Sequence, residues 1–127
     1  MKKILIITSI LLLVLLLTVM AVNILTNPLR KSKETIKENI LETTPLGTSM
    51  EDVIKTIKKN DEWKLEYVVD DYGYNDPETF DVIGEKYVRA NIGSYFDGFT
   101  AHVVVFWGFD EESKLISIAV QKFWNGL

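Results

Sequence analysis

Residues 100–124 read TAHVVVFWGF, then DEESK, then LISIAVQKFW, and this stretch decides the fold. The two outer runs are rich in β-branched and aromatic residues, whereas the five residues between them are charged or polar. Such runs on either side of a short polar segment are typical of antiparallel strands joined by a hairpin loop. We therefore expect strands over about residues 100–109 and 115–124, with the loop at residues 110–114.

Two runs upstream alternate between apolar and polar residues, as half-buried strands do. In residues 63–69 the alternation puts four apolar side chains on one face, namely Trp63, Leu65, Tyr67 and Val69. In residues 87–92 the apolar members are Val88, Ala90 and Ile92, and the intervening ones are Tyr87, Arg89 and Asn91. Four successive strands predict a meander sheet.

Two amphipathic helices precede these strands. The first is expected over residues 33–42, and the turn-forming residues 43–47 end it. Ser49, with Asp52 three residues later, is close to a capping box and predicts a second helix that runs to Lys59. We therefore predict an α+β domain in which both helices pack on one face of a four-stranded antiparallel meander sheet.

The N-terminal segment is apolar on every side. Lys2 and Lys3 precede an apolar run from Ile4 to Leu25, which as a helix would rise about 33 Å and match a hydrocarbon core of roughly 30 Å. We expect residues 1–27 to be an uncleaved membrane anchor. The alternative is a signal peptide cleaved after Ala21, where small residues give an acceptable cleavage pattern.

Residues 28–34 form a short basic linker, and residues 35–127 form one small domain. Basic residues flank both ends of the apolar run, so charge alone does not orient it, but the short N-terminal tail favours a domain outside the cytoplasm. The expected location is the cell membrane, with a single span and an extracytoplasmic C-terminal domain. Cleavage after Ala21 would instead give a secreted protein.

Charge and cysteine content narrow the classes of function. The net charge is −4 and all 18 acidic residues follow residue 30, so without Lys2 and Lys3 the remainder carries −6. This balance argues against nucleic acid, and against an anionic lipid surface, as the main partner. The absence of cysteine excludes disulfides, thiolate metal sites, a cysteine nucleophile and lipoprotein acylation.

No constellation of residues points to catalysis or to a cofactor. His102 is the only histidine, and no Gly-x-Ser-x-Gly turn accompanies it, so an ordinary histidine on the sheet surface is expected. The acidic stretch at residues 70–78 misses the spacing of an EF-hand and is more typical of a solvated loop than of a calcium site. We therefore expect no enzyme activity, no catalytic residue, no cofactor and no metal.

Alternation predicts an aromatic patch on the sheet face away from the helices. If the core-facing set is Val88, Ala90, Val103, Val105, Ile116, Ile118 and Val120, the opposite set is Tyr87, Arg89, His102, Val104, Phe106 and Phe123. Exposed apolar patches often mark protein contacts. With the neighbouring loop, the candidate partner-binding residues are Tyr87, Arg89, His102, Phe106, Phe123, Asp71, Tyr72 and Tyr74. Two alternatives stay open: a bulge near Gly93 or Gly108 shifts the register, or the loop at residues 70–84 folds over the patch.

Residues 45–53 read PLGTSMEDV, which joins the two helices and precedes the strands. Gly47, Ser49 and Val53 fit a Gly-x-Ser/Thr-x-x-x-Val turn, and the chain thereby resembles the β-lactamase-inhibitory-protein-like fold over about residues 33–127. The small lipoprotein family of the outer-membrane assembly machinery shares that fold, and uncharacterised single-anchor proteins of Gram-positive bacteria look similar. The resemblance implies a binding or scaffolding module and no particular partner.

The expected function is a membrane-tethered, extracytoplasmic protein-binding module of the inhibitor, immunity or envelope-scaffold type. Its partners would be another envelope or extracellular protein and, through the N-terminal helix, the membrane. The alternative is a sensor of a small ligand or signal at the cell surface. That alternative predicts a closed apolar pocket near Trp63, Tyr67 and Trp107.

Overall fold

A computed structural model describes residues 1–125 of the chain. The helical elements are α1 (Lys2–Thr26), the short 3-10 helix η1 (Pro28–Arg30), α2 (Lys33–Thr43) and α3 (Met50–Lys59). The strands are β1 (Lys64–Val69), β2 (Tyr74–Asn75), β3 (Val82–Ile83), β4 (Lys86–Asp97), β5 (Phe99–Phe109) and β6 (Leu115–Asn125). The predicted α+β class is confirmed.

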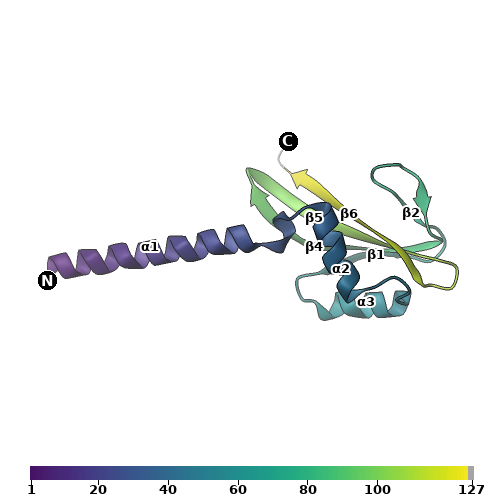
Figure 1. Ribbon diagram of the computed structural model, residues 1–127, viewed down its shortest axis with the longest axis horizontal. Coiled ribbons are helices and arrows are strands. Elements are labelled where there is room, and N and C mark those ends of the chain that lie inside the picture. Colours follow the sequence, from purple (N-terminus) through teal and green to yellow (C-terminus); the bar gives the residue numbers. More distant parts are fainter. Residues whose placement is uncertain (126–127) are drawn as a thin grey trace.

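The main sheet has the strand order β1-β4-β5-β6, and each pair of neighbouring strands is antiparallel. The helices α2 and α3 lie on one face of it, as Figure 1 shows. A two-stranded ribbon, β2 with β3, is inserted between β1 and β4. This ribbon was not predicted from the sequence, because strands of two residues carry no periodic pattern.

The β5–β6 hairpin forms for a local reason. Asp110 Oδ1 accepts hydrogen bonds from the backbone N–H groups of Glu112 and Lys114, at 2.9 Å each. These bonds satisfy donors that a loop would otherwise leave to water, and acidic side chains commonly stabilise turns in this way. The predicted loop at residues 110–114 is thereby confirmed.

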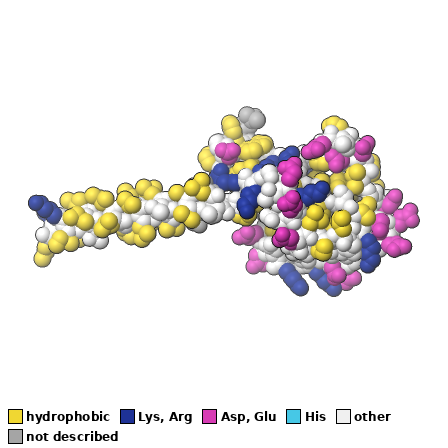
Figure 2. Space-filling model, viewed as in Figure 1, with side chains coloured by type: hydrophobic (Ala, Val, Ile, Leu, Met, Phe, Trp, Pro, Cys, Tyr) yellow, Lys and Arg dark blue, Asp and Glu magenta, His cyan; other side chains and the backbone are white. Residues whose placement is uncertain are grey.

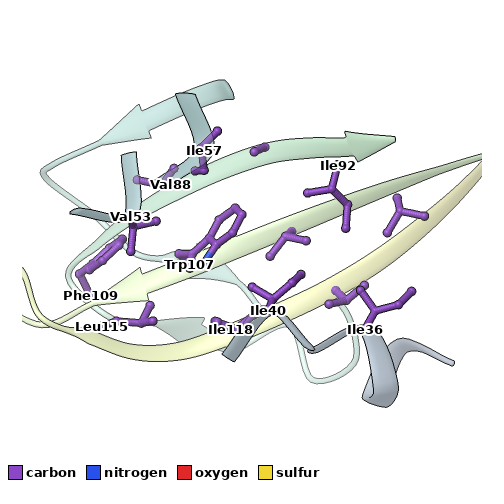
Figure 3. Packing of buried hydrophobic residues seen from close by; sticks show 14 of the residues in the cluster. Ile36, Ile40, Val53, Ile57, Val88, Ile92, Trp107, Phe109, Leu115 and Ile118 are labelled. Atoms are coloured by element: carbon purple, nitrogen blue, oxygen red, sulfur yellow. The ribbon is translucent and has the colours of Figure 1, made fainter. Parts of the chain in front are cut away.

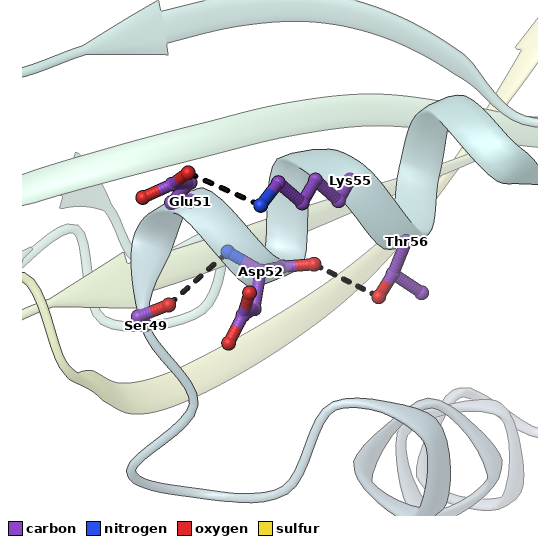
Figure 4. Close-up of polar contacts among 5 residues, drawn as sticks. All are labelled: Ser49, Glu51, Asp52, Lys55 and Thr56. Atoms are coloured by element: carbon purple, nitrogen blue, oxygen red, sulfur yellow. Dashed lines mark hydrogen bonds and ion pairs between the residues drawn. The ribbon is translucent and has the colours of Figure 1, made fainter.

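The start of α3 is fixed by its N-cap. Ser49 Oγ accepts a hydrogen bond from the backbone N–H of Asp52 at 3.1 Å, as drawn in Figure 4. An N-cap oxygen satisfies one of the first N–H groups of a helix, which have no partner within it. Glu51 forms an exposed ion pair with Lys55 one turn later, a contact worth a few tenths of a kcal/mol at about this spacing.

The hydrophobic core lies between the helices and the covered face of the sheet (Figure 3). Its fully buried side chains include Val53, Ile57, Val88, Val103, Val105, Trp107 and Phe109. The indole Nε1 of Trp107 donates a hydrogen bond to Thr44 Oγ1 at 3.1 Å, and both residues are fully buried. The one polar group of the largest core side chain is therefore satisfied.

Three irregularities in register change which residues share a face. The β1–β4 pairing shifts between Leu65 and Tyr67, the β4–β5 pairing shifts at Ile92, and the β5–β6 pairing shifts at Ile116. Each inserts one extra residue into one strand, which reverses the alternation beyond it. The prediction that residues 63–69 share one apolar face is therefore wrong, because Leu65 packs against the core while Tyr67 pairs with Arg89.

The register shift in β6 also makes one prediction about the core wrong, namely that Ile116 faces the helices. Ile116 is 45% exposed, and Leu115 is buried opposite Phe109. The strand β4 also runs further than expected, through Gly93 to Asp97, because the bulge lets it continue past the predicted end.

The helix α1 projects from the domain as a single rod (Figures 1 and 2). It is long and apolar enough to cross a membrane over Lys2–Val22, and none of that window is buried. The segment expected as a linker is in contact with the sheet: the position of a Cβ on Gly93 would lie 2.8 Å from Leu29 Cδ1.

Candidate functional site

The candidate site is the sheet face opposite α2 and α3, which we call the open face. The register places Tyr87, Arg89, His102, Phe106 and Phe123 on it, by the pairs Arg89 with Phe106 and His102 with Phe123. The bulge at Ile92 follows Tyr87 and Arg89 in β4. The bulge at Ile116 precedes Phe123 in β6. The predicted register shifts are real, but they leave the five residues together on one face.

One half of the open face is covered by the β2–β3 ribbon. The ring of Tyr74 stacks on Phe106 with centroids 5.4 Å apart and meets Tyr87 edge to face at 6.4 Å. Tyr74 is 2% exposed, and its hydroxyl lies 3.0 Å from Ser117 Oγ. Burial is the main reason that the pKa of Tyr74 lies above its ordinary value. The expectation that residues 70–84 fold over the patch holds for this half.

Of the three candidates in the loop, only Tyr74 is part of the packed structure. Tyr72 is 57% exposed and touches the edge of Tyr87, with centroids 5.9 Å apart. Asp71 is exposed. Burial, and then Tyr72, raise the pKa of Tyr87 above its ordinary value. Tyr72 therefore lies at the rim of the covered half and Tyr74 forms its centre, whereas Asp71 is an exposed residue of the loop.

The other half of the open face is uncovered and is organised around Arg89. The guanidinium carbon of Arg89 lies 5.6 Å from the ring centroid of Tyr67, 5.4 Å from that of Phe106 and 5.7 Å from that of Phe123. An arginine over an aromatic ring is attracted by the negative face of the π system. We call these four residues the Arg89 cluster.

The Arg89 cluster is partly exposed and carries nearly balanced charge. Tyr67 is 55% exposed and Phe123 is 38% exposed. Glu66 Oε1 accepts a hydrogen bond from Arg89 Nε at 3.4 Å, with about 30% of each side chain accessible. An exposed pair of this kind adds little to folding stability. The contact uses only Nε of the guanidinium, whose two terminal nitrogens can donate to another acceptor.

His102 lies beside the Arg89 cluster and has a structural contact. Its Nε2 is 2.6 Å from the side-chain nitrogen of Asn125, which can only donate, so Nε2 accepts. Within residues 1–125, no group of three or more His, Asp or Glu side chains could hold a metal ion. The contact ties the last described residue of β6 to β5.

The acidic loop has its own internal structure. Asp76 Oδ1 accepts hydrogen bonds from the backbone N–H groups of Glu78 at 2.8 Å and Thr79 at 3.1 Å. These two bonds hold the pKa of Asp76 below its ordinary value. A carboxylate used in this way shapes the turn between β2 and β3.

The three residues expected around the pocket of a small-ligand sensor do not lie together. Trp63 and Trp107 pack ring against ring on the covered face, with centroids 6.1 Å apart, while Tyr67 lies on the open face. A different hollow of about 300 Å³ lies under the ribbon, lined by Tyr72, Gly73, Tyr74, Asn75, Val82, Tyr87 and Phe106.

Sequence reasoning missed Tyr67 and Glu66 as members of the site. Glu66 is the extra residue of the bulge in β1 and Tyr67 follows it, and no turn residue or proline marks that bulge in the sequence. The only available signal was the charge of Glu66, which could pair with an arginine on the neighbouring strand.

Comparison of the chain with models of protein families, with curated protein sequences and with solved structures gave no match. The resemblance to the β-lactamase-inhibitory-protein-like fold stays a prediction. Its motif residues have clear local roles here: Gly47 takes a φ of 91°, Ser49 caps α3, and Val53 is fully buried.

Proposed function

We propose that the protein is a membrane-tethered protein-binding module, and that it contacts another envelope or extracellular protein through the Arg89 cluster. The observation that carries the proposal is the position of the Arg89 guanidinium within 5.7 Å of three aromatic rings, of which Tyr67 and Phe123 are exposed and Phe106 borders the half covered by the ribbon. Arginine and tyrosine surrounded by aromatic area are the residues that most often dominate protein interfaces.

The exposure of the cluster supports this reading over a purely structural one. The hydrophobic core cluster lies on the covered face, where the helices pack on the sheet. Tyr67 and Phe123 make no contribution to that core, yet they keep large apolar surfaces in water next to Arg89. Exposed apolar surface has a cost in solubility that a binding partner would remove.

The apolar helix α1 supports the tethered part of the proposal. Its span over Lys2–Val22 fits the thickness of a bilayer. A domain held at a membrane meets other proteins of that membrane at a raised effective concentration, so a modest contact area is sufficient. The proposal includes an uncleaved α1 with the domain outside the cytoplasm. The alternative is a secreted form, produced by cleavage after Ala21.

The test is quantitative capture of partners from the native membrane by the full-length chain. The Tyr67→Ser/Phe123→Ser variant removes two exposed rings of the Arg89 cluster, and Leu46→Ser removes an apolar side chain that is 62% exposed elsewhere. A specific partner should be recovered with the parent and Leu46→Ser chains and lost with the double variant. Equal recovery with all three chains would contradict the proposal, provided that their unfolding curves match.

A second candidate function rests on the hollow under the ribbon. Its volume of about 300 Å³ and its wall of four aromatic rings, from Tyr72, Tyr74, Tyr87 and Phe106, lie at the lower limit for small-molecule sites. A sensor of a small aromatic or apolar ligand would use this hollow. A thermal-shift screen separates the two functions, because a bound ligand raises the melting temperature and Val82→Trp, at the lip of the hollow, should abolish that rise.

A further inference from the structure

The end of the domain from which α1 leaves carries three exposed aromatic side chains. Phe96 is 66% exposed, Phe99 is 44% exposed and Trp124 is 43% exposed. Phe96 and Phe99 flank the turn of the β4–β5 hairpin, and Trp124 is near the end of β6. Figure 2 shows apolar side chains gathered at this end, beside the root of α1.

Several contacts fix this end of the sheet to the segment that follows α1. A terminal nitrogen of Arg30 donates a hydrogen bond to the carbonyl oxygen of Phe96. Lys122 Nζ donates to the carbonyl oxygen of Lys31 at 2.8 Å. Leu29 occupies the space that a side chain on residue 93 would need. The hairpin is therefore held at a defined height relative to the helix.

That height coincides with the surface of a bilayer spanned by α1. The apolar run reaches Leu25 and the helix ends at Thr26, so a bilayer spanned by α1 has the boundary of its hydrocarbon core at the last turn of the helix. The polar layer on each side of a hydrocarbon core is roughly 5–8 Å thick. Figure 1 shows the β4–β5 hairpin reaching back alongside the last turn of α1, so its tip lies at the level of that layer.

The chemistry at this end suits the same layer. Trp124 packs edge to face against Tyr95 with centroids 5.8 Å apart, and Tyr95 lies under both Arg30 and Lys122. Tryptophan, together with arginine and lysine, concentrates at membrane–water interfaces, where an apolar ring and a polar or charged group are both satisfied. Asp97 lies in the turn itself, between Phe96 and Phe99.

We infer that the β4–β5 hairpin tip and Trp124 insert into the interfacial layer of the bilayer that α1 spans, and so orient the domain on the membrane. The inference rests on the membrane tether of the proposed function. It concerns a different surface from the Arg89 cluster, and the occupant is lipid. The insertion would hold the sheet at a fixed angle and keep the open face at a constant distance from the bilayer.

The absence of cysteine allows a direct test with single spin labels on the full-length chain. Asp97→Cys places the label in the turn and retains all three aromatic side chains. Glu112→Cys, in the β5–β6 loop at the opposite end of the sheet, is the matched control. Each protein is reconstituted into lipid nanodiscs that hold one chain, and collisions of the label with a water-soluble nickel reagent and with oxygen are measured.

The label at residue 97 should collide severalfold less often with nickel, and more often with oxygen, than the label at residue 112. Adding Phe96→Ser and Phe99→Ser should return residue 97 to the accessibility of the control. Equal accessibility at 97 and 112 in the parent chain, or no response to the two serines, would overturn the inference. Because each nanodisc holds only lipid and one chain, these results do not depend on whether the Arg89 cluster captures a partner.

Discussion

The ring of Tyr74 lies directly over the backbone of Gly108, so closely that a Cβ at residue 108 would come within 2.7 Å of Tyr74 Cε1. The two residues are 34 positions apart in the chain, and the contact closes the ribbon onto the open face. The absence of a side chain at residue 108 is what lets the ring reach Phe106 and the hydroxyl reach Ser117.

Gly108→Ala should therefore destabilise the domain by about 1–3 kcal/mol, as overpacking usually does. The loss should be smaller in a Tyr74→Ala background, because the clash then has no partner. Urea unfolding of the four proteins of this cycle in detergent measures the coupling. Additive losses would show that Tyr74 and Gly108 do not touch.

The buried bond between Trp107 and Thr44 predicts a second effect. Thr44→Val removes the acceptor and leaves the indole N–H of Trp107 without a partner in the core, at a cost of about 1–3 kcal/mol. Thr43→Val, at an exposed position next to it, should change stability by less than about 0.5 kcal/mol. Equal unfolding midpoints for the two variants would contradict the assignment of this bond.

The N-cap of α3 predicts a third effect on stability, and a second substitution at the same residue should avoid it. Ser49→Ala removes the acceptor for the Asp52 N–H and should destabilise the domain by about 1 kcal/mol. Ser49→Asp keeps an acceptor oxygen and adds a negative charge at the helix N-terminus, which is favourable. Its denaturation midpoint should match the parent chain, and a loss as large as that of Ser49→Ala would refute the capping role.

The hydrogen bonds accepted by Asp76 predict that the stability of the β2–β3 ribbon depends on pH. Its carboxylate accepts two backbone hydrogen bonds, which put its folded pKa below the ordinary value of 3.8. A depressed pKa of an acid gives stabilisation that is complete above the unfolded pKa and is lost as pH falls through the folded pKa. Carbon-13 titration of the Asp76 carboxyl should give a midpoint below 3.8.

The amide signals of Glu78 and Thr79 should shift with the same midpoint as the Asp76 carboxyl. In Asp76→Asn, whose oxygen still accepts but does not titrate, that shared transition should disappear. A midpoint at or above the ordinary value would show that the two hydrogen bonds do not persist in solution.

The parts of the fold that depend on local patterns could be predicted from the sequence. The β5–β6 hairpin follows from alternation on either side of residues 110–114, and α3 follows from Ser49 and the spacing of its apolar residues. The sheet order then follows because consecutive strands usually lie next to each other in a sheet. The helix α1 needs only its length and composition.

The parts that depend on bulges and distant contacts could not be predicted. A bulge at Glu66, Ile92 or Ile116 leaves the local composition unchanged while it moves later residues to the other face. This is why the alternation in the sequence puts Tyr67 on the same face as Trp63 and Leu65, and Ile116 in the core-facing set. The burial of Tyr74 arises from Gly108 and Phe106, which no window around residue 74 contains.

The central claim is that the Arg89 cluster is the surface that meets a partner protein. The most direct measurement places a photoreactive phenylalanine analogue at Tyr67 in the full-length chain, or at Glu112 as the control, and irradiates the native membrane. We predict one cross-linked partner at residue 67 that is absent at residue 112 and is lost when Arg89→Ala is added. Cross-linking only to lipid or to nothing at residue 67, or the same products at both positions, would contradict the claim.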